Sequence, residues 1–443
     1  MSLELVRPYI RGRGAVNIAQ GVEAAIRESA LAPDARLPTI RELARALSVS
    51  PTTVASAYRT LQARGVVFAR GRLGTRVSYM PNRSARRLRA PVRGLRNLAD
   101  GNPDPALLPN PSRAVRHIDP SPCLYGVETQ HEGLARLARS EFDEAGVAAG
   151  PTCIVHGAMD AIDRLFAEHL RPGDRVAVED PGFTGVHDLA ISRGLSLLPV
   201  RLDDEGPLPE SLREACSSGA SAFVVTPRAQ SPTGCTLSSR RARTLRRVLS
   251  QHPDLLIIED DHASWISAAP LRCLHSARRR RWANVRSLSK SINPDLRLAL
   301  MTGAEETVAR VRDRMIVAQR WVSHILQRLA HRMLSDRKVR SQMERAAKTY
   351  ARRRERLLEA LAAHGVSAHG RSSYNVWIPV VEETATVQAL AERGWAICPG
   401  ERFRLSSAPA VRITASTLRA EEAGRLAADV ATVLRACGDG ALE

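Results

Sequence analysis

The sequence predicts two domains of different fold class: a small helical domain with a β-hairpin wing, followed by an α/β domain with a mostly parallel sheet. Two observations support this division. Within the first 80 residues, two short helical patterns joined by a tight turn are followed by a hairpin pattern. From residue 97 onward, short apolar runs alternate with longer amphipathic patterns, as in parallel strands joined by helices.

Composition excludes several classes of protein. The 443 residues are 44% hydrophobic and 25% charged, which is typical of a globular protein of more than one domain. No apolar stretch is long enough to span a bilayer, and the first residues lack a signal-peptide pattern. The seven cysteines form no CxxC pair. We therefore expect a cytoplasmic protein with free thiols, without a membrane partner or a cysteine metal site.

The positive charge is concentrated at the N-terminus. Residues 1–98 contain 18 arginines and five acidic residues, which accounts for 13 of the 19 net positive charges. A basic end on a nearly balanced body favours an anionic partner for that end, most simply nucleic acid.

The N-terminal elements follow from apolar spacing and from capping residues. Helical spacing predicts a first helix over residues 15–30. Thr39, with Glu42 three residues later, forms a capping-box pattern, which predicts a second helix ending near Ser48. A short turn then leads to a third helix over 52–64. Such a helix-turn-helix can place its last helix in the DNA major groove.

A hairpin pattern follows this helix. Gly65 stands where a helix-ending glycine is expected, and residues 66–70 and 75–79 predict two short strands around a glycine turn. Arg70 and Arg72 near the tip of this wing suit phosphate groups or a minor groove. The alternative interpretation, a helical protein–protein module, does not account for charge, turn and wing together.

This stretch resembles the winged helix-turn-helix of the GntR regulator family, from Arg36-Leu37-Pro38-Thr39 to Gly74-Thr75. The match covers about residues 12–79 and implies binding to double-stranded promoter DNA. Pro51 departs from it, because relatives often have Arg there. The positions that the resemblance implies for DNA contact are Arg41, Ser50, Thr52, Thr53, Arg70 and Gly71. We expect the DNA-binding domain over 1–80 and a basic linker over 81–96.

In the second domain, apolar runs predict buried strands, and amphipathic patterns predict helices between them. Ligands of such sheets bind at the carboxyl ends of the strands. The predicted strands cover 175–178, 222–225, 255–258 and 285–288, and the helices include 158–170, 238–249 and 339–362. We expect a large part over 97–330 and a small α+β part over 331–443.

Residues with reactive side chains follow these strands. Asp260 follows one strand, Lys290 another, and Gly157 opens a helix where backbone N–H groups can bind a phosphate. A lysine for an imine, a carboxylate for a pyridinium nitrogen and a phosphate cup are the set that pyridoxal phosphate requires. Taken alone, each residue is explained better by packing, capping or an ion pair. Their joint order favours the cofactor.

Lys290 is one of only three lysines among 65 basic residues. A guanidinium cannot lose its proton in a protein, whereas a desolvated lysine can form a Schiff base. The alternative interpretation is that composition favours Arg and that Lys290 is an ordinary surface residue.

The set resembles fold-type I aminotransferases, the pyridoxal-phosphate-dependent transferase fold. With the GntR-type head, the chain resembles the MocR subfamily of regulators and, within it, PtsJ-like members linked to vitamin B6 metabolism. The resemblance implies that Lys290 forms the internal aldimine, that Asp260 pairs with the ring nitrogen and that Arg412 binds an amino acid's carboxylate. It implies that the cofactor's phosphate contacts Gly157, Ala158, Met159, Ser287, Ser289 and Arg297. It also implies that Tyr125 reaches the phosphate bound by the partner subunit, and that Phe183 stacks on the pyridine ring.

Two positions depart from the aminotransferase pattern. Ser231 replaces an Asn and His262 replaces a Tyr, both of which normally contact the phenolic oxygen of the cofactor. Cofactor binding remains expected, but efficient transamination does not. The expected function is a homodimeric regulator that senses pyridoxal phosphate or an amine effector. The alternatives are an active aminotransferase that carries a DNA-binding head, and a DNA-binding dimer with a dead cofactor site.

Overall fold

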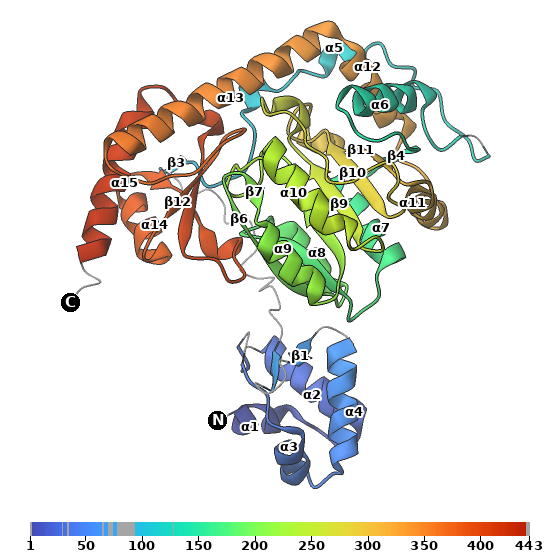
Figure 1. Ribbon diagram of the computed structural model, residues 1–443, viewed down its shortest axis with the longest axis vertical. Helices are drawn as coiled ribbons and strands as arrows, with labels where there is room; N and C mark the ends of the chain where they lie inside the picture. The colour runs from blue at the N-terminus through green and yellow to red at the C-terminus, as the bar shows by residue number, and fades with distance from the viewer. Residues whose placement is uncertain are drawn as a thin grey trace. The chain divides into compact units, whose positions relative to one another are not determined.

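A computed structural model describes residues 2–28, 30–32, 35–63, 66–69, 74–77, 94–126 and 128–439 (Figure 1). The chain divides into two compact units. One contains the N-terminal residues together with His169–Val176 and His187–Leu198, and the other contains the rest of the body. Each is described by itself. No helix of the described residues is long and apolar enough to cross a membrane.

The N-terminal domain has its own apolar core, to which Ile18, Leu43, Val54 and Leu61 contribute fully buried side chains. The capping box predicted for the second helix is confirmed. The Glu42 N–H donates to Thr39 Oγ1 at 3.3 Å, and the Thr39 N–H donates to the Glu42 carboxylate at 2.8 Å. The helices are α1 (Ser2–Val6), η1 (Arg7–Tyr9), α2 (Ala15–Arg27), α3 (Ile40–Leu47) and α4 (Pro51–Ala63).

The wing is an antiparallel pair. Strand β1 (Val67–Ala69) pairs with β2 (Thr75–Val77), and Val67 lies opposite Val77. The Leu37 N–H donates to the Thr75 carbonyl, which joins the start of the α3 segment to the wing. Gly65, Arg70, Gly71 and Arg72 lie outside the described residues, as does most of the expected linker.

The body is built on an eight-stranded sheet with the order β4-β11-β10-β9-β8-β5-β6-β7. Strands β8, β9 and β10 pair in parallel, whereas β11 pairs antiparallel with both β10 and β4. The strands are β4 (Thr152–Val155), β5 (Arg175–Asp180), β6 (Ser196–Asp203), β7 (Gly206–Pro207), β8 (Ala220–Val225), β9 (Leu256–Asp261), β10 (Trp282–Ser287) and β11 (Ala299–Gly303).

The predicted strands and helices of the body are found, with shifted ends. The main shift matters for the site: Asp260 lies within β9 rather than after it. Ser287 lies at the end of β10, within the predicted strand. The helices are α5 (Ser112–Val115), α6 (Glu132–Glu144), α7 (Ala158–His169), α8 (Thr184–Ser192), α9 (Pro209–Ser217), α10 (Ser239–Ser250), α11 (Glu305–Val317) and α12 (His324–Ser335).

The small part of the body follows the long helix α13 (Arg337–Ala363) (Figure 1). Its antiparallel sheet has the order β12-β15-β14, and the buried Trp395 and Leu357 belong to the core beneath it. The remaining elements are β12 (Asn375–Pro379), α14 (Glu383–Glu392), β13 (Trp395–Ala396), β14 (Cys398–Pro399), β15 (Ala410–Thr414) and α15 (Glu422–Asp439). Strand β3 (Arg96–Asn97) pairs in parallel with β13, so Arg96, expected at the end of the linker, belongs to the body.

Candidate functional site

Lys290 follows β10, and its Nζ donates a hydrogen bond to the Gly101 carbonyl at 2.6 Å. Burial of the amine, and then the positive charge of Arg412, lowers the pKa of Lys290 to about 8. Both causes disfavour the ammonium form. Lys290 is therefore closer to the neutral, nucleophilic amine than an ordinary lysine is.

Consecutive residues of β9 point to opposite faces of the sheet. Asp261 accepts hydrogen bonds from Nε and Nη2 of Arg228, at 2.7 and 2.8 Å, and from Arg286 Nε at 3.2 Å. Asp260 faces the other way. Its Oδ1 is buried without a hydrogen-bond partner among the described residues, and burial, followed by the charge of Asp261, raises its pKa to about 7. A buried, unpaired carboxylate oxygen fits a protonated ring nitrogen.

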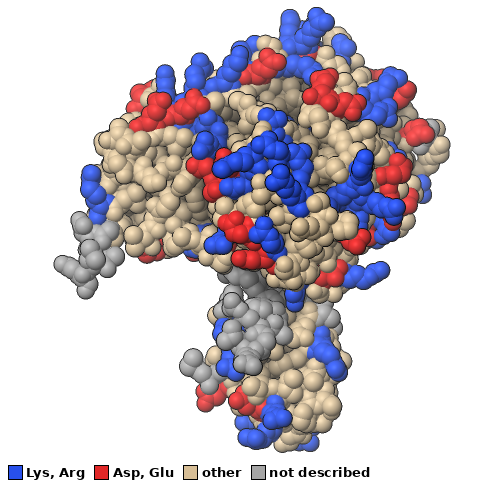
Figure 2. All heavy atoms as spheres, in the orientation of Figure 1, with Lys and Arg blue, Asp and Glu red and all other residues tan. Residues whose placement is uncertain are grey.

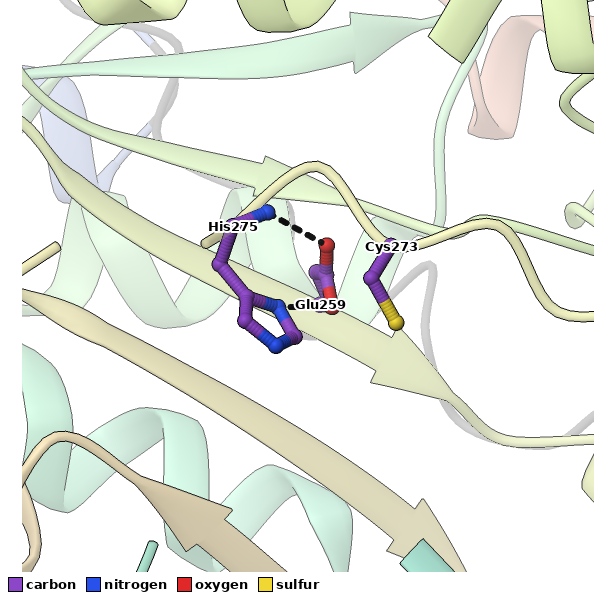
Figure 3. Close-up of side chains that lie close together, drawn as sticks. All are labelled: Glu259, Cys273 and His275. Atoms are coloured by element: carbon purple, nitrogen blue, oxygen red, sulfur yellow. Dashed lines mark hydrogen bonds and ion pairs between the residues drawn. The ribbon is translucent and has the colours of Figure 1, made fainter. Parts of the chain in front are cut away.

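Glu259 precedes these aspartates and lies between His275 and Cys273 (Figure 3). Its carboxylate accepts hydrogen bonds from the His275 ring at 2.9 Å and from Asn284 at 3.0 Å. The other ring nitrogen of His275 lies 3.3 Å from the Ala148 backbone nitrogen. The ligating atoms of the three side chains lie within 4.8 Å of one another, as in some metal sites. Because the hydrogen bonds of the carboxylate and the ring are already made, we interpret the group as a buried structural anchor of β9.

His262 follows β9, and its Nε2 lies 2.9 Å from the Ala229 carbonyl. Burial, and then the charge of Lys290, lowers its pKa to about 4. The ring is therefore neutral near pH 7 and donates its Nε2–H to the carbonyl, which leaves Nδ1 as an acceptor. Ala229 adopts φ 54°, and Ser231 lies two residues farther along the same loop.

Two of the predicted phosphate positions, Gly157 and Arg297, lie close together before α7. Gly157, with φ +99°, lies between β4 and α7, and a Cβ added to it would come within 3.4 Å of Arg297 Nη2. Such a side chain would fill space beside the guanidinium. Ala158 and Met159 open α7, where N–H groups have no helical partner and can bind an anion. The Ser289 N–H donates to Ser287 Oγ at 3.2 Å.

Arg412 lies in β15 and is buried. One Nη donates to the Ala99 carbonyl, while Nε has no hydrogen-bond partner among the described residues. The guanidinium carbon lies 4.8 Å from the centre of the Phe403 ring. Burial lowers the pKa of Arg412, yet guanidinium remains protonated in proteins. A buried cation with an unused donor fits a carboxylate ligand.

Two predicted residues lie apart from this group. Tyr125 is 79% exposed, and its ring packs against Trp321 at a centroid distance of 5.5 Å. Phe183 is 40% exposed and directly precedes α8. The roles of both, stated above as implied by resemblance, stay predictions.

Sequence reasoning missed Arg228, Arg286 and Tyr374. The first two hold Asp261, and the Tyr374 hydroxyl donates to the Gly101 carbonyl at 3.3 Å. Arg228 and Arg286 are two of many arginines, and nothing in the sequence distinguishes a buried one. The only available signal was Asp261, since a second buried carboxylate beside Asp260 requires a cation.

In the N-terminal domain, Ser50 gathers two of the predicted DNA contacts. Ser50 Oγ lies 2.7 Å from the hydroxyls of both Thr52 and Thr53, and it accepts the Thr53 N–H at 3.1 Å. Ser50 therefore caps α4, which explains why that helix begins at Pro51. Arg41, in the first turn of α3, is exposed.

Comparisons with known families agree with this geometry. Residues 127–430 match the aminotransferase class I and II family, and residues 15–77 match the bacterial regulatory proteins of the gntR family. The aminotransferase family is pyridoxal-phosphate-dependent. The chain belongs to the MocR subfamily of GntR regulators, in which a GntR-type winged helix is fused to a fold-type I aminotransferase domain.

Individual proteins similar to this chain include transcriptional regulators. The vitamin B6 salvage pathway transcriptional repressor PtsJ of Salmonella typhimurium is 38% identical over 95% of this chain and 98% of its own length. The regulator TauR of Rhodobacter capsulatus is 28% identical over 84% and 85%. Among solved structures, Pyrococcus horikoshii kynurenine aminotransferase superposes with a TM-score of 0.70 at 20% identity, covering 78% of this chain and 92% of its own, which shows the fold.

Proposed function

We propose that this chain binds promoter DNA through its N-terminal domain and pyridoxal phosphate through Lys290, and that it reports the cofactor or an amine effector to transcription. The supporting observation is that two buried residues have an unused polar atom and a third has a lowered pKa. Among the described residues, Asp260 has an unpaired oxygen and Arg412 has an unpaired N–H, and Lys290, which donates to the Gly101 carbonyl, has a lowered pKa. Such unsatisfied groups are costly in a folded protein unless a ligand uses them.

Each residue has a distinct task at this site. When bound, pyridoxal phosphate supplies an aldehyde carbon that amines attack. Lys290 supplies the attacking amine, Asp260 accepts a hydrogen bond from the ring nitrogen, and Arg412 holds a carboxylate of the effector. The N–H groups at the start of α7, with Arg297, bind the phosphate. The neutral His262 contributes a hydrogen-bond acceptor where relatives have a phenol.

Control of vitamin B6 metabolism is the regulatory role that we favour. It rests on the likeness to PtsJ, a repressor of vitamin B6 salvage by its name. The direction of control, and the genes controlled, are left to experiment.

An active aminotransferase is the second candidate, because Lys290, Asp260 and Arg412 are all present. Ser231 and His262 argue against rapid turnover, since neither supplies the group that tunes the phenolic oxygen in relatives. Steady conversion of an amino donor and a keto acceptor into equal amounts of product favours the enzyme. A single, stoichiometric reaction favours the regulator.

The body also carries an exposed apolar surface that suits a second copy of the chain. Leu124 is 69% exposed and Val317 is 82% exposed, and Tyr125 and Ile325 extend the surface. These residues lie on neighbouring segments, because Tyr125 packs on Trp321 and α12 contacts α5. Apolar patches of this kind typically mark an interface. We propose a homodimer in which each Tyr125 reaches the partner's phosphate.

The full chain tests the proposal in two steps. Purified protein mixed with pyridoxal phosphate should turn yellow and keep the cofactor after borohydride reduction, and Lys290→Ala should not. Duplexes enriched by the protein from a random DNA pool should then bind with an affinity that changes with pyridoxal phosphate. Equal spectra of wild type and Lys290→Ala after reduction would contradict the cofactor site. An unenriched pool would contradict the DNA-binding role.

A further inference from the structure

The segment Arg96–Asp104, called the tether segment here, is the first part of the body after the expected linker. Its beginning is fastened to the small part. The Arg96 guanidinium binds both oxygens of Glu422, at 2.9 and 3.1 Å, and Arg96 itself lies in β3. Its end is fastened to α13. The Asp104 carboxylate pairs with Arg353 at 2.8 Å, and the Asp104 N–H donates to the Tyr350 hydroxyl at 3.0 Å.

Between these two ends, the tether segment crosses the candidate cofactor site. The Ala99 carbonyl accepts a hydrogen bond from Arg412, and the Gly101 carbonyl accepts one from Lys290. Backbone oxygens of this segment therefore occupy the two donors that are proposed to hold ligand groups.

Ligand binding must compete with both contacts. A lysine ammonium has three N–H donors, whereas an imine nitrogen keeps at most one, so attachment of pyridoxal phosphate weakens the bond from Lys290 to Gly101. A carboxylate is a stronger acceptor for guanidinium than a neutral carbonyl is, so an effector competes with Ala99 for Arg412. Either event removes a fastening from the middle of the segment.

Chain connectivity allows this competition to affect the DNA-binding domain. In sequence, the tether segment directly follows the residues that join the body to the DNA-binding domain. A displacement of the segment therefore also displaces the end of the linker that is attached to it. The contacts of Asp104 with Arg353 and Tyr350 involve neither Lys290 nor Arg412. They hold the segment in place independently of any ligand, which sets how readily the segment is displaced.

We propose that the tether segment is the element that reads occupancy of the cofactor site: its carbonyls stand in for ligand groups, and their displacement is passed to the DNA-binding domain. Asp104 and Arg353 are positioning residues that hold the segment in its ligand-free place. This inference rests on the proposed function and adds the route by which the two domains communicate.

Amide hydrogen exchange of the full-length protein tests the first part of the proposal, that ligand binding displaces the tether segment. In wild type, pyridoxal phosphate should speed exchange of the amides of Leu98–Asp104 by about tenfold, because bonds that order this segment are lost. Unchanged exchange in protein that has turned yellow would overturn the proposal. A colourless protein would instead remove the proposed function on which it rests, so the two failures are distinguishable.

Variants of the Asp104–Arg353 contact test the second part of the proposal, that displacement of the segment changes DNA binding. Arg353→Gln and Asp104→Asn should exchange rapidly without the cofactor, and their ratio of DNA affinities with and without pyridoxal phosphate should shrink by about fivefold. The reduced spectrum should stay that of wild type. Asp203→Asn, which breaks the 2.7 Å pair with Arg241 elsewhere on the body, should behave as wild type. A wild-type affinity ratio in both Arg353→Gln and Asp104→Asn would overturn the proposal.

Discussion

Opposite electrostatic environments act on neighbouring residues of β9. Asp261 is held by two guanidinium groups, so its pKa is lowered although burial alone would raise it. Asp260, one residue earlier, forms no ion pair among the described residues, and burial, followed by the charge of Asp261, raises its pKa to about 7. The alternation of side chains along the strand separates these environments.

The lowered pKa of Lys290 predicts a pH-dependent reaction with pyridoxal phosphate. The observed rate of colour formation should rise with pH and level off above about 8, because only the neutral amine attacks. Arg412→Met removes the second cause of the shift and should move the midpoint to higher pH. Arg371→Met, a change at an exposed arginine of the body, should not. Stopped-flow absorbance gives the midpoints, and equal midpoints for wild type and Arg412→Met would contradict this account.

The buried hydrogen bonds of Glu259 predict that replacing this residue lowers the free energy of unfolding. Glu259→Gln replaces a carboxylate oxygen with an amide that donates toward His275 and Asn284, so we expect a loss of about 1–3 kcal/mol in the free energy of unfolding. The charge of His275, and then hydrogen bonds from His275 and Asn284, hold the pKa of Glu259 below its ordinary 4.5 despite burial. Its stabilisation is therefore present above that pH and is lost as pH falls through the lower folded-state pKa.

Denaturant unfolding from pH 7 to pH 4 checks this effect. The gap between wild type and Glu259→Gln should be widest at neutral pH and should narrow toward acid. Glu214→Gln, at an exposed position of α9, serves as the control and should match wild type. A Glu259→Gln protein as stable as wild type at pH 7 would show that the buried anchor is dispensable.

At the scale of elements, the candidate DNA surface consists of two helix starts: that of α4, where hydroxyl groups are hydrogen-bonded to one another, and that of α3, which exposes Arg41. The hydroxyls of Ser50, Thr52 and Thr53 are linked to one another, so their positions are fixed before DNA binds. Fixed donors lose less entropy on binding than mobile ones. Arg41, by contrast, is an exposed side chain whose charge suits a phosphate.

Arg41→Ala should weaken binding to the selected DNA and leave the cofactor spectrum unchanged. If Arg41 contacts one phosphate, the log–log slope of affinity against salt should fall by about 0.9. Arg7→Ala, in η1, removes the same charge from the same domain and provides the control. Equal affinities for wild type and Arg41→Ala across the salt series would contradict the placement of this surface.

The sequence predicted most of these elements because their signals are local. The capping box at Thr39, the buried strands and the long α13 each arise from spacing or capping within one segment. The antiparallel strand β11 was missed, since an apolar run carries no direction along the chain. The buried arginines around Asp261, and the tether segment's contact with Lys290, were missed because they join residues far apart in sequence.

At the scale of the whole molecule, the body exposes both charged and apolar side chains. On the face of the body drawn in Figure 2, acidic and basic side chains both occur, and basic ones gather over α10. Arg240 of α10 pairs with Glu205 at 3.1 Å. Leu124, Tyr125 and Val317 are exposed apolar side chains, and the Arg320 guanidinium lies over the Tyr125 ring. Exposed apolar, aromatic and arginine side chains of this kind suit association with another protein surface.

Substitutions on that surface test the homodimer. Leu124→Asp and Val317→Asp should each convert the protein to a monomer in light scattering, because a buried unpaired charge opposes association. The monomer should also bind pyridoxal phosphate more weakly, since Tyr125 of the partner is lost. Val381→Asp changes another valine, 63% exposed, in the loop before α14 and should leave the dimer intact. A dimeric Leu124→Asp/Val317→Asp double variant would place the interface elsewhere.

The alternation of Glu259, Asp260 and Asp261 also constrains how this gene can change. A single-codon insertion or deletion before Asp260 would reverse the face of every side chain beyond it. Asp260 would then turn to the face of the sheet on which Arg228 and Arg286 now bind Asp261. Because both positions carry Asp, composition and charge would be almost unchanged while the site lost its supporting network. Homologous genes should therefore tolerate substitutions in this strand more readily than changes in its length.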